Sequence, residues 1–317
     1  MGRLSKCAGA VVMAVVLALI GAQPASAGDG RGGDDGRNGS GQHQRQSQYL
    51  ALGDSVPFGY NPLLMPVLPS TTPPIVTDFV GYPELAAPKL KLALTNASCP
   101  GQTSGGFISL TPTTDDNGCF VYRFGLHFPL HTAYDSSQLD YAVSKLRSDR
   151  NIRLVTMSLG ANDLIRCADQ STDKCASRLP TVLGDYQTNL TKIIKAIRKV
   201  YDGKLVAVTY YSPDYGDLAT TGGIAALNDV TTQVIHNFHG TIADGFAAFA
   251  AASEAAGSPG KPCEAGLLIK LPNGSCNFHP SPAGAQVLAD TLTAAVVCDP
   301  AYGDNRNRED SLVGANG

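Results

Sequence analysis

The sequence offers a candidate nucleophile near its beginning. Gly53-Asp54-Ser55 follows directly after an apolar run that begins at Tyr49. A strand that stops at a glycine can turn sharply, and open α/β sheets bind their ligands beyond the carboxyl ends of the strands. Ser55 would then lie at that edge, where a serine hydroxyl can attack an acyl carbon. The alternative is an ordinary turn, because Gly, Asp and Ser are common turn residues.

Acyl transfer also needs a base for the proton of the nucleophile and donors for the developing oxyanion. Asn162 follows a buried apolar run and can donate from its amide, while Gly160 lets the backbone turn closely. His279 is followed by Pro280 and a helix start, a suitable place for a basic imidazole. Gly101 can offer an unhindered backbone N–H. Each of these segments, taken alone, also fits an ordinary turn or surface loop.

Strand and helix patterns alternate along the chain. Strands are expected at 49–53, 92–95, 154–159, 204–211 and 241–244, and helices at 83–91, 137–147, 186–201, 223–238 and 282–297. The run 154–159 is continuously apolar, as expected of a strand buried on both faces. Strands separated by helices predict an α/β fold with a mainly parallel central sheet covered on both sides. The candidate residues would meet at one edge of that sheet.

The four segments, in this order, resemble the SGNH hydrolases, also called the GDSL esterase/lipase family. Gly53-Asp54-Ser55 matches the first family block, Gly101 the glycine block, 160–163 the Gly-x-Asn-Asp block and His279-Pro280 the histidine block. The resemblance covers about 49–297 and is closest to secreted actinobacterial-type lipases and esterases. It implies a three-layer α/β/α sandwich of flavodoxin-like type.

The resemblance also implies roles for these residues. Ser55 would be the nucleophile and His279 the base. The oxyanion hole would comprise the backbone N–H groups of Ser55 and Gly101 and the side-chain amide of Asn162. The turns would be supported by Asp54, Gly160 and Asp163. No metal or cofactor is implied; the partner would be an acyl-ester substrate, which a lipid interface could present to a monomeric enzyme.

One position departs from the family pattern. The family usually has an aspartate three residues before the histidine, where this chain has Cys276. An imidazole base needs an acceptor for its other nitrogen. We expect a backbone carbonyl around 275–276 to orient His279; a carboxylate from elsewhere, with Glu264 the nearest, is the alternative. An ordinary histidine base would make activity rise through roughly pH 6–7.

The amino-terminal residues have the pattern of a secretory signal peptide. Arg3 and Lys6 precede an apolar run, and Ala25-Ser26-Ala27 provides a small-residue cleavage site. We therefore expect Sec-type cleavage near Ala27 and a secreted protein. Seven of the eight cysteines remain after cleavage, and in an exported chain closely spaced cysteines predict disulfides. Of the possible pairings, proximity favours Cys99–Cys119, Cys167–Cys175 and Cys263–Cys276, which leaves Cys298 over.

Composition predicts one folded domain. After the signal peptide (1–27), residues 28–47 contain no apolar residue and are expected to form a disordered leader. Residues 48–298 suit a single hydrolase domain, and the polar tail 299–317 is expected to be disordered. The net charge without the basic residues of the signal peptide is −5, from 22 basic and 27 acidic residues. This mild acidity, without a basic stripe, argues against a nucleic-acid partner.

These features predict a secreted serine ester hydrolase, a lipase or esterase that works through an acyl-enzyme. The segment 61–78 begins six residues after Ser55 and holds five prolines among apolar residues. An apolar segment beside a reactive serine favours lipid or fatty-acyl esters, phospholipids included. The alternative for this segment is a stiff connection packed on the surface. A polysaccharide or cell-wall deacetylase of the same fold, and a secreted binding module without turnover, are the competing functions.

Overall fold

The computed structural model describes residues 46–65, 74–110 and 118–298. Five parallel strands form one sheet in the order β2-β1-β3-β4-β5. Their bounds are Gln48–Gly53 for β1, Ala93–Asn96 for β2, Ile152–Ser158 for β3, Lys204–Val208 for β4 and Thr241–Ala243 for β5. This order is typical of flavodoxin-like folds. The predicted α/β fold with a parallel sheet is confirmed.

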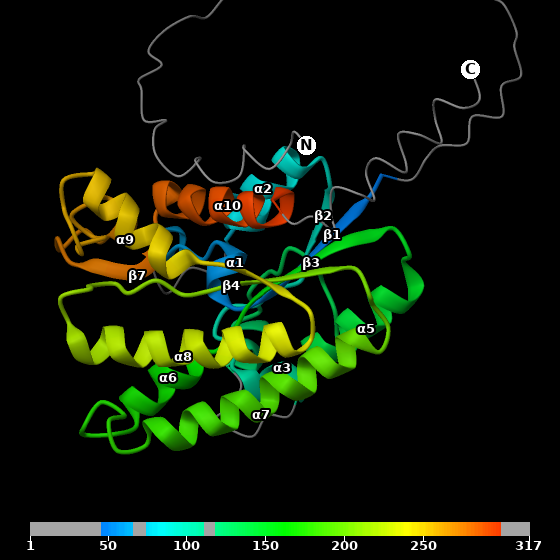
Figure 1. Cartoon of the computed structure of the whole chain (residues 1–317), viewed down its shortest axis with the longest axis horizontal. Helices are drawn as coiled ribbons and strands as arrows, with labels where there is room; N and C mark the ends of the chain where they lie inside the picture. Colours follow the sequence, from blue (N-terminus) through cyan, green and yellow to red (C-terminus); the bar gives the residue numbers. More distant parts are fainter. Residues whose placement is uncertain (1–45, 66–73, 111–117, 299–317) are drawn as a thin grey trace, which may run out of the picture. The chain divides into compact units, whose positions relative to one another are not determined.

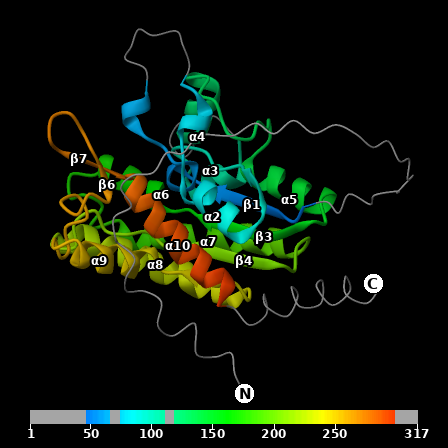
Figure 2. The same ribbon diagram turned by 90° about the horizontal axis from the view of Figure 1, so that it is seen from above.

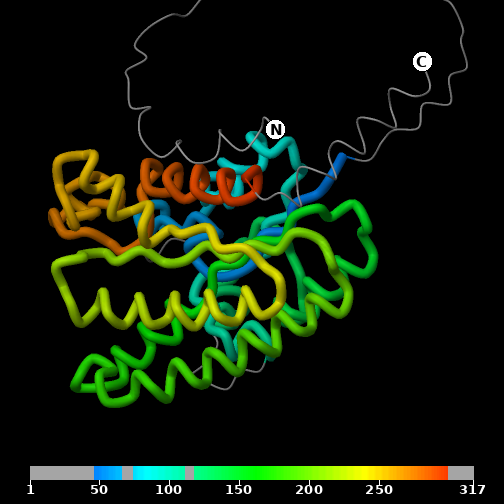
Figure 3. Tube along the Cα trace, viewed as in Figure 1, coloured from blue at the N-terminus to red at the C-terminus, as the bar shows by residue number. Residues whose placement is uncertain are grey.

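Helices cover both faces of the sheet, as Figures 1 and 3 show. One layer contains α2 (Tyr82–Leu90), α9 (Gly245–Ala255) and α10 (Pro282–Val297). The other contains α3 (Ser104–Ile108), α5 (Gln138–Ser148), α6 (Ala161–Asp169), α7 (Leu179–Arg198) and α8 (Leu218–Asn237). Seen from above, α10 and α2 cross in front of the strands (Figure 2). None of the helices within the described ranges could span a bilayer, because none is both long and apolar enough.

The remaining elements are short. The helix α1 (Ser55–Phe58) follows β1 directly, and two 3-10 helices occupy Pro62–Leu64 and Val76–Asp78. The helix α4 (Gly118–Phe120) continues into a π-helical turn at Val121–Gly125. An antiparallel hairpin of β6 (Leu268–Lys270) and β7 (Cys276–Pro280) precedes α10.

The central strands and the long helices share one core. The apolar residues of β1 and β3 are buried on both faces of the sheet, as the sequence of 154–159 predicted. The helix α7 buries one stripe of apolar side chains against the sheet, formed by Leu190, Ile193, Ile194 and Ile197. At the start of α10, Ser281 caps the helix by accepting the N–H of Gly284, and Pro282 occupies the first turn.

Some boundaries differ from the expectation. The helix α8 begins at Leu218 rather than near 223, because Asp217 accepts the N–H groups of Ala219 and Thr220 and so caps an earlier turn. The strand β4 ends at Val208 and not at 211. The helix α9 and the hairpin β6–β7 were not predicted. The sequence of α9 is rich in alanine, so its apolar residues show no clear stripe.

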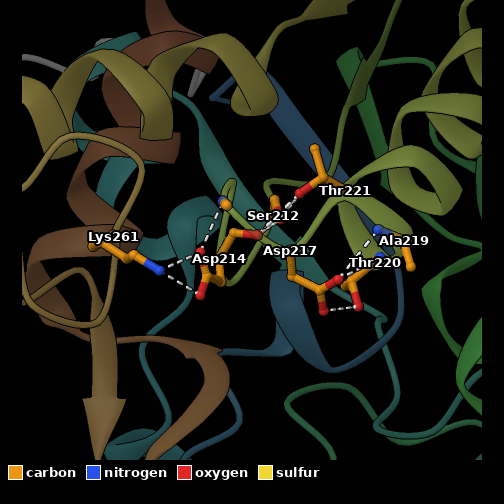
Figure 4. A network of polar contacts seen from close by, with 8 residues as sticks. Ser212, Asp214, Asp217, Ala219, Thr220, Thr221 and Lys261 are labelled. Atoms are coloured by element: carbon orange, nitrogen blue, oxygen red, sulfur yellow. Dashed lines mark hydrogen bonds and ion pairs between the residues drawn. The ribbon is translucent and has the colours of Figure 1, made fainter.

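The loop between β4 and α8 is held by polar contacts, which Figure 4 shows. Lys261 Nζ lies 2.8 and 2.7 Å from the two carboxylate oxygens of Asp214. The hydroxyls of Ser212 and Thr221 are 2.7 Å apart. These contacts fix the segment that follows β4 at the edge of the sheet where β1 and β3 also end.

Three disulfides join Cys99 to Cys119, Cys167 to Cys175 and Cys263 to Cys276. These are the pairs that proximity in the sequence favoured. Cys298, directly after α10, is exposed. The predicted signal peptide (1–27), nearly all of the predicted leader and the predicted tail (299–317) lie outside the described residues.

Candidate active site

Ser55 and His279 are 224 positions apart in the sequence and in direct contact in the structure. His279 Nε2 and Ser55 Oγ are 2.9 Å apart. Ser55 opens α1 at the end of β1, and His279 lies on β7 just before α10. Both residues are largely buried, with exposed fractions of 7% and 5%. At this distance an imidazole can take the proton of the hydroxyl.

The turn that carries Ser55 requires a glycine. Gly53 has φ +125°, and a Cβ at this position would lie 2.0 Å from the carbonyl oxygen of Ser158 on β3. The side chain of Gln138, from α5, accepts the N–H of Gly53 at 2.6 Å and donates to its carbonyl at 3.0 Å. Asp54 Oδ1 then caps α1 by accepting the N–H of Val56 at 3.0 Å. The position of Ser55 is therefore fixed by the contacts of Gly53 before it and of Val56 after it.

The other ring nitrogen of His279 contacts Asn277. Asn277 Oδ1 lies 2.5 Å from His279 Nδ1, and the same oxygen accepts the backbone N–H of His279 at 3.0 Å. A backbone N–H only donates, so the atom that faces it is the amide oxygen and not the amide nitrogen. An oxygen acceptor requires a hydrogen on Nδ1. The lone pair of Nε2 then points at Ser55.

This contact corrects the expected orienting group of His279. The carbonyl of Ser275 accepts the N–H of Leu271 across the hairpin, and Glu264 is exposed. In a strand, side chains two residues apart lie on the same face, so Asn277 is the residue beside the ring. The spacing Asn-x-His was the available signal, because Asn side chains commonly bond the backbone N–H two residues on.

The surroundings of His279 are apolar. The ring centroid of Tyr60 lies 4.8 Å and that of Phe278 4.4 Å from the centroid of the imidazole. Burial among these rings disfavours the imidazolium and lowers the pKa of His279 to about 3. The expected rise of activity at pH 6–7 was based on the ordinary pKa of a histidine, which burial lowers here. The loss of activity on acidification is expected near the lowered pKa instead.

Asn162 lies between the Ser55 turn and the loop that holds Gly101. Its Nδ2 donates to the carbonyl of Gln102 at 3.1 Å and to Asp54 Oδ2 at 3.3 Å. Gly160, with φ +117°, leads into α6, and a Cβ there would lie 2.6 Å from the ring of Tyr186. The close packing of this turn brings the amide of Asn162 to Asp54, the residue directly before Ser55.

The loop that holds Gly101 is anchored at both ends. Gly101 has φ +73°, and a Cβ there would lie 3.0 Å from the carbonyl carbon of Gly118, the neighbour of a disulfide-bonded cysteine. On the other side, Asp163 accepts the backbone N–H of Ser104 at 3.0 Å and its hydroxyl at 2.5 Å. All four segments that the sequence singled out therefore meet at one edge of the sheet.

A buried carboxylate lies behind the serine. Asp54 Oδ2 accepts the hydroxyl of Tyr210 at 2.5 Å. Burial raises the pKa of Asp54 to about 7, although the hydrogen bond from Tyr210 opposes the shift. Sequence reasoning missed Tyr210 and Gln138, because neither belongs to a local pattern with the residues that it contacts.

Aromatic side chains connect His279 with segments that carry exposed apolar residues. The ring of Tyr60 packs at a tilt against His279 and also contacts the rings of Phe79, Tyr122 and Phe128. We call the exposed apolar residues of these segments the apolar rim: Leu63, Leu64, Ile75, Val80, Val121, Phe124, Leu126 and Phe278. Part of the predicted apolar segment 61–78 contributes to it, while 66–73 lie outside the described residues. In the ranges that the structure describes, no cluster of three or more His, Cys, Asp or Glu could hold a metal ion.

Residues 51–287 match the model of the GDSL-like Lipase/Acylhydrolase family. The match spans most of the chain, so the chain belongs to this family and is a carboxylic ester hydrolase of the GDSL type. The resemblance to the SGNH hydrolases is confirmed. No curated protein matches the chain.

Several solved structures are similar to this chain at low identity. A GDSL-like lipase from Parabacteroides merdae aligns with a TM-score of 0.50 and 12% identity, over 79% of this chain and 95% of that one. An extracellular lipase from Streptomyces rimosus has a TM-score of 0.49 and 17% identity, over 78% and 99%. An acetylxylan esterase from Geobacillus stearothermophilus has a TM-score of 0.47 and 15% identity, over 78% and 92%.

Proposed function

We propose that the protein is a secreted serine hydrolase of acyl esters, with Ser55 as nucleophile and His279 as base. The observation that supports these roles is the 2.9 Å contact between His279 Nε2 and Ser55 Oγ. The contact of Nδ1 with Asn277 leaves the lone pair of Nε2 free for the proton of the serine. The family supplies the class of reaction.

The reaction would have two halves. Ser55 Oγ attacks the ester carbonyl carbon while its proton moves to His279 Nε2. The tetrahedral intermediate collapses, the ester C–O bond breaks, and the leaving alcohol takes the proton from Nε2. Water then attacks the acyl-enzyme and gives a proton to Nε2, which returns it to the leaving Ser55 oxygen.

The oxyanion would be stabilised by the N–H groups of Ser55 and Gly101 and by the amide of Asn162. Both hydrogens of Asn162 Nδ2 face protein acceptors, and the contact with Asp54, at 3.3 Å, is the longer one. In our proposal the oxyanion replaces this longer contact, and the carbonyl of Gln102 keeps the amide oriented. Donors held in place before the reaction are the largest source of such stabilisation.

The proposed substrates are fatty-acyl or lipid esters. The apolar rim supports them, because exposed apolar side chains on the segments that adjoin His279 or lead to Tyr60 can hold an acyl chain. A panel of acetyl, butyryl and long-chain esters tests this choice. Higher kcat/KM for the longer chains is expected, whereas a marked preference for acetyl groups would favour a polysaccharide or cell-wall deacetylase.

Export is part of the proposal. Three disulfides among the described residues fit an oxidising compartment, and residues 1–27 have the composition of a signal peptide. We further propose that residues 48–298 form the complete hydrolase domain and act as a monomer. Expression of 48–298 alone, followed by assay and sizing, tests this point.

Replacement of the nucleophile tests the core of the proposal. We expect Ser55→Ala to lose roughly 10⁴-fold or more of kcat and to escape labelling by a fluorophosphonate probe. Ser148→Ala, at the exposed end of α5, is the matched control and should label and hydrolyse like the wild type. A folded wild-type protein that neither labels nor hydrolyses any ester would favour the binding module without turnover.

A further inference from the structure

The hairpin that carries His279 also holds Asn277 in place. Cys276, the first residue of β7, is bonded to Cys263, and the hydroxyl of Tyr211 donates to the carbonyl of Phe278 at 2.7 Å. Asn277 and His279 lie on the same face of β7, two residues apart. The strand therefore fixes the amide beside the imidazole.

The two contacts of Asn277 Oδ1 give the amide a defined orientation. A side-chain amide can normally turn over and exchange its oxygen and nitrogen. Here the backbone N–H of His279 donates to the amide at 3.0 Å, so the atom that accepts must be the oxygen of Asn277. The imidazole then has one suitable tautomer, with the hydrogen on Nδ1 and the lone pair on Nε2, toward Ser55.

We propose that Asn277 is the positioning residue of His279, a neutral amide that fixes the Nδ1–H tautomer where a carboxylate would otherwise do so. The inference rests on the proposed function of Ser55 and His279. It adds that the base acts without an anionic partner, so the imidazolium formed during the reaction has no adjacent negative charge on the Nδ1 side.

The other titratable groups around His279 fit this assignment. Tyr60 packs at a tilt against the imidazole, and burial raises the pKa of Tyr60, so it stays neutral. Tyr211, after β4, is likewise neutral because burial raises its pKa well above the ordinary value. Asp54 directs its carboxylate to Tyr210 and Asn162. None of these groups takes the place of a carboxylate at Nδ1.

The test compares Asn277→Asp with Asn277→Ala in the full chain. The aspartate keeps an oxygen acceptor for the backbone N–H and the Nδ1–H of His279, and it adds a negative charge. We expect Asn277→Asp to retain activity within about tenfold and to shift the acidic limb of kcat/KM upward by roughly 1–3 pH units, because a nearby anion favours the imidazolium. We expect Asn277→Ala to lose about 10²-fold or more of kcat, because the tautomer is no longer fixed.

Asn273 provides a matched control in the same hairpin. Its Oδ1 accepts the N–H of Ser275 at 3.0 Å, the same contact two residues on that Asn277 makes, but no imidazole is present. Asn273→Asp and Asn273→Ala should leave kcat and the pH profile unchanged. Thermal unfolding of all four variants checks that each folds.

The outcomes separate this inference from the proposed function. Suppose that the wild type hydrolyses esters. The role of Asn277 alone is then overturned if kcat of Asn277→Ala lies within threefold of the wild type. It is also overturned if the acidic limb of the pH profile does not move in Asn277→Asp. If Asn277→Asp is inactive, the tautomer of His279 is measured by ¹⁵N NMR in Asn277→Ala. A hydrogen that stays on Nδ1 contradicts the inference. A mixture of the two tautomers supports it. Full activity of Ser55→Ala would instead refute the proposed function.

Discussion

The hydroxyl of Tyr210 donates a hydrogen bond of 2.5 Å to Oδ2 of Asp54, the residue directly before Ser55. The same carboxylate group caps α1 through Val56 and accepts the amide of Asn162. One buried side chain thus connects the end of β1, the start of α6 and the segment after β4. The spatial relation between the nucleophile and the proposed oxyanion donor depends on this carboxylate.

Tyr210→Phe should reduce both stability and turnover. The buried carboxylate loses its shortest hydrogen bond, and such a loss costs about 1–3 kcal/mol of the free energy of unfolding. Asp54 would then bind the amide of Asn162 more strongly, and we expect a decrease of kcat of roughly tenfold as the amide becomes less available to the oxyanion. Urea unfolding and kcat on a soluble ester measure the two effects. The control is Tyr141→Phe, because Tyr141 has a half-buried ring that stacks on Tyr134. Unchanged stability and kcat in Tyr210→Phe would contradict the proposed connection between Tyr210, Asp54 and Asn162.

The stability of the protein should depend weakly on pH between about pH 4 and 6.5, because two buried groups oppose each other. The pKa of His279 falls from 6.5 to about 3 on folding, so the unfolded chain binds the extra proton and stability decreases as the pH falls through 6.5. The pKa of Asp54 rises from 3.8 to about 7, so the folded chain binds the extra proton, and the stability present at low pH is lost as the pH rises through 7.

Asp54→Asn removes one side of this balance. The variant should lose about 3 kcal/mol of unfolding free energy between pH 6.5 and 4 relative to the wild type, from about 1.4 kcal/mol per pH unit. His279→Gln should show the opposite slope, and the double variant should again be nearly flat. The measurement is urea unfolding at a series of pH values. Parallel curves for the wild type and Asp54→Asn would show that Asp54 does not titrate in this range.

The glycine before Asp54 should tolerate no side chain. At Gly53 a Cβ would lie 2.0 Å from the carbonyl oxygen of Ser158, and φ is +125°. Gly53→Ala should therefore cost more than about 4 kcal/mol, among the largest effects of single substitutions, or prevent folding. Gly222→Ala, inside α8 with open space around the new methyl group, should instead stabilise the protein by about 0.5–1 kcal/mol. Similar melting temperatures for the two variants would contradict the packing of β1 against β3.

The parts of this fold that sequence predicts are local. The helices expected at 186–201 and 282–297 depend on residues a few positions apart, and both are present as α7 and α10. Gln138 lies 85 positions from Gly53, and Tyr210 lies 156 from Asp54, so their contacts exist only after the sheet has formed. Asn277 is different, because its relation to His279 is local and follows from the geometry of a strand. It was missed because β7 was taken for a loop.

The disulfide at the start of β7 should matter for turnover as well as for stability. Cys263 and Cys276 close a loop over a sequence separation of 13, and their replacement by serines should cost roughly 3 kcal/mol. The strand that holds Asn277 and His279 would also lose its anchor at the first residue, so we expect kcat to fall by about tenfold or more.

The pair of Cys167 and Cys175 joins the end of α6 to the loop before α7 and serves as control. Its replacement should lower the melting temperature and leave kcat unchanged, because no residue that contacts His279 lies on that loop. Equal kcat in the two double-serine variants would show that the hairpin holds the imidazole without its disulfide.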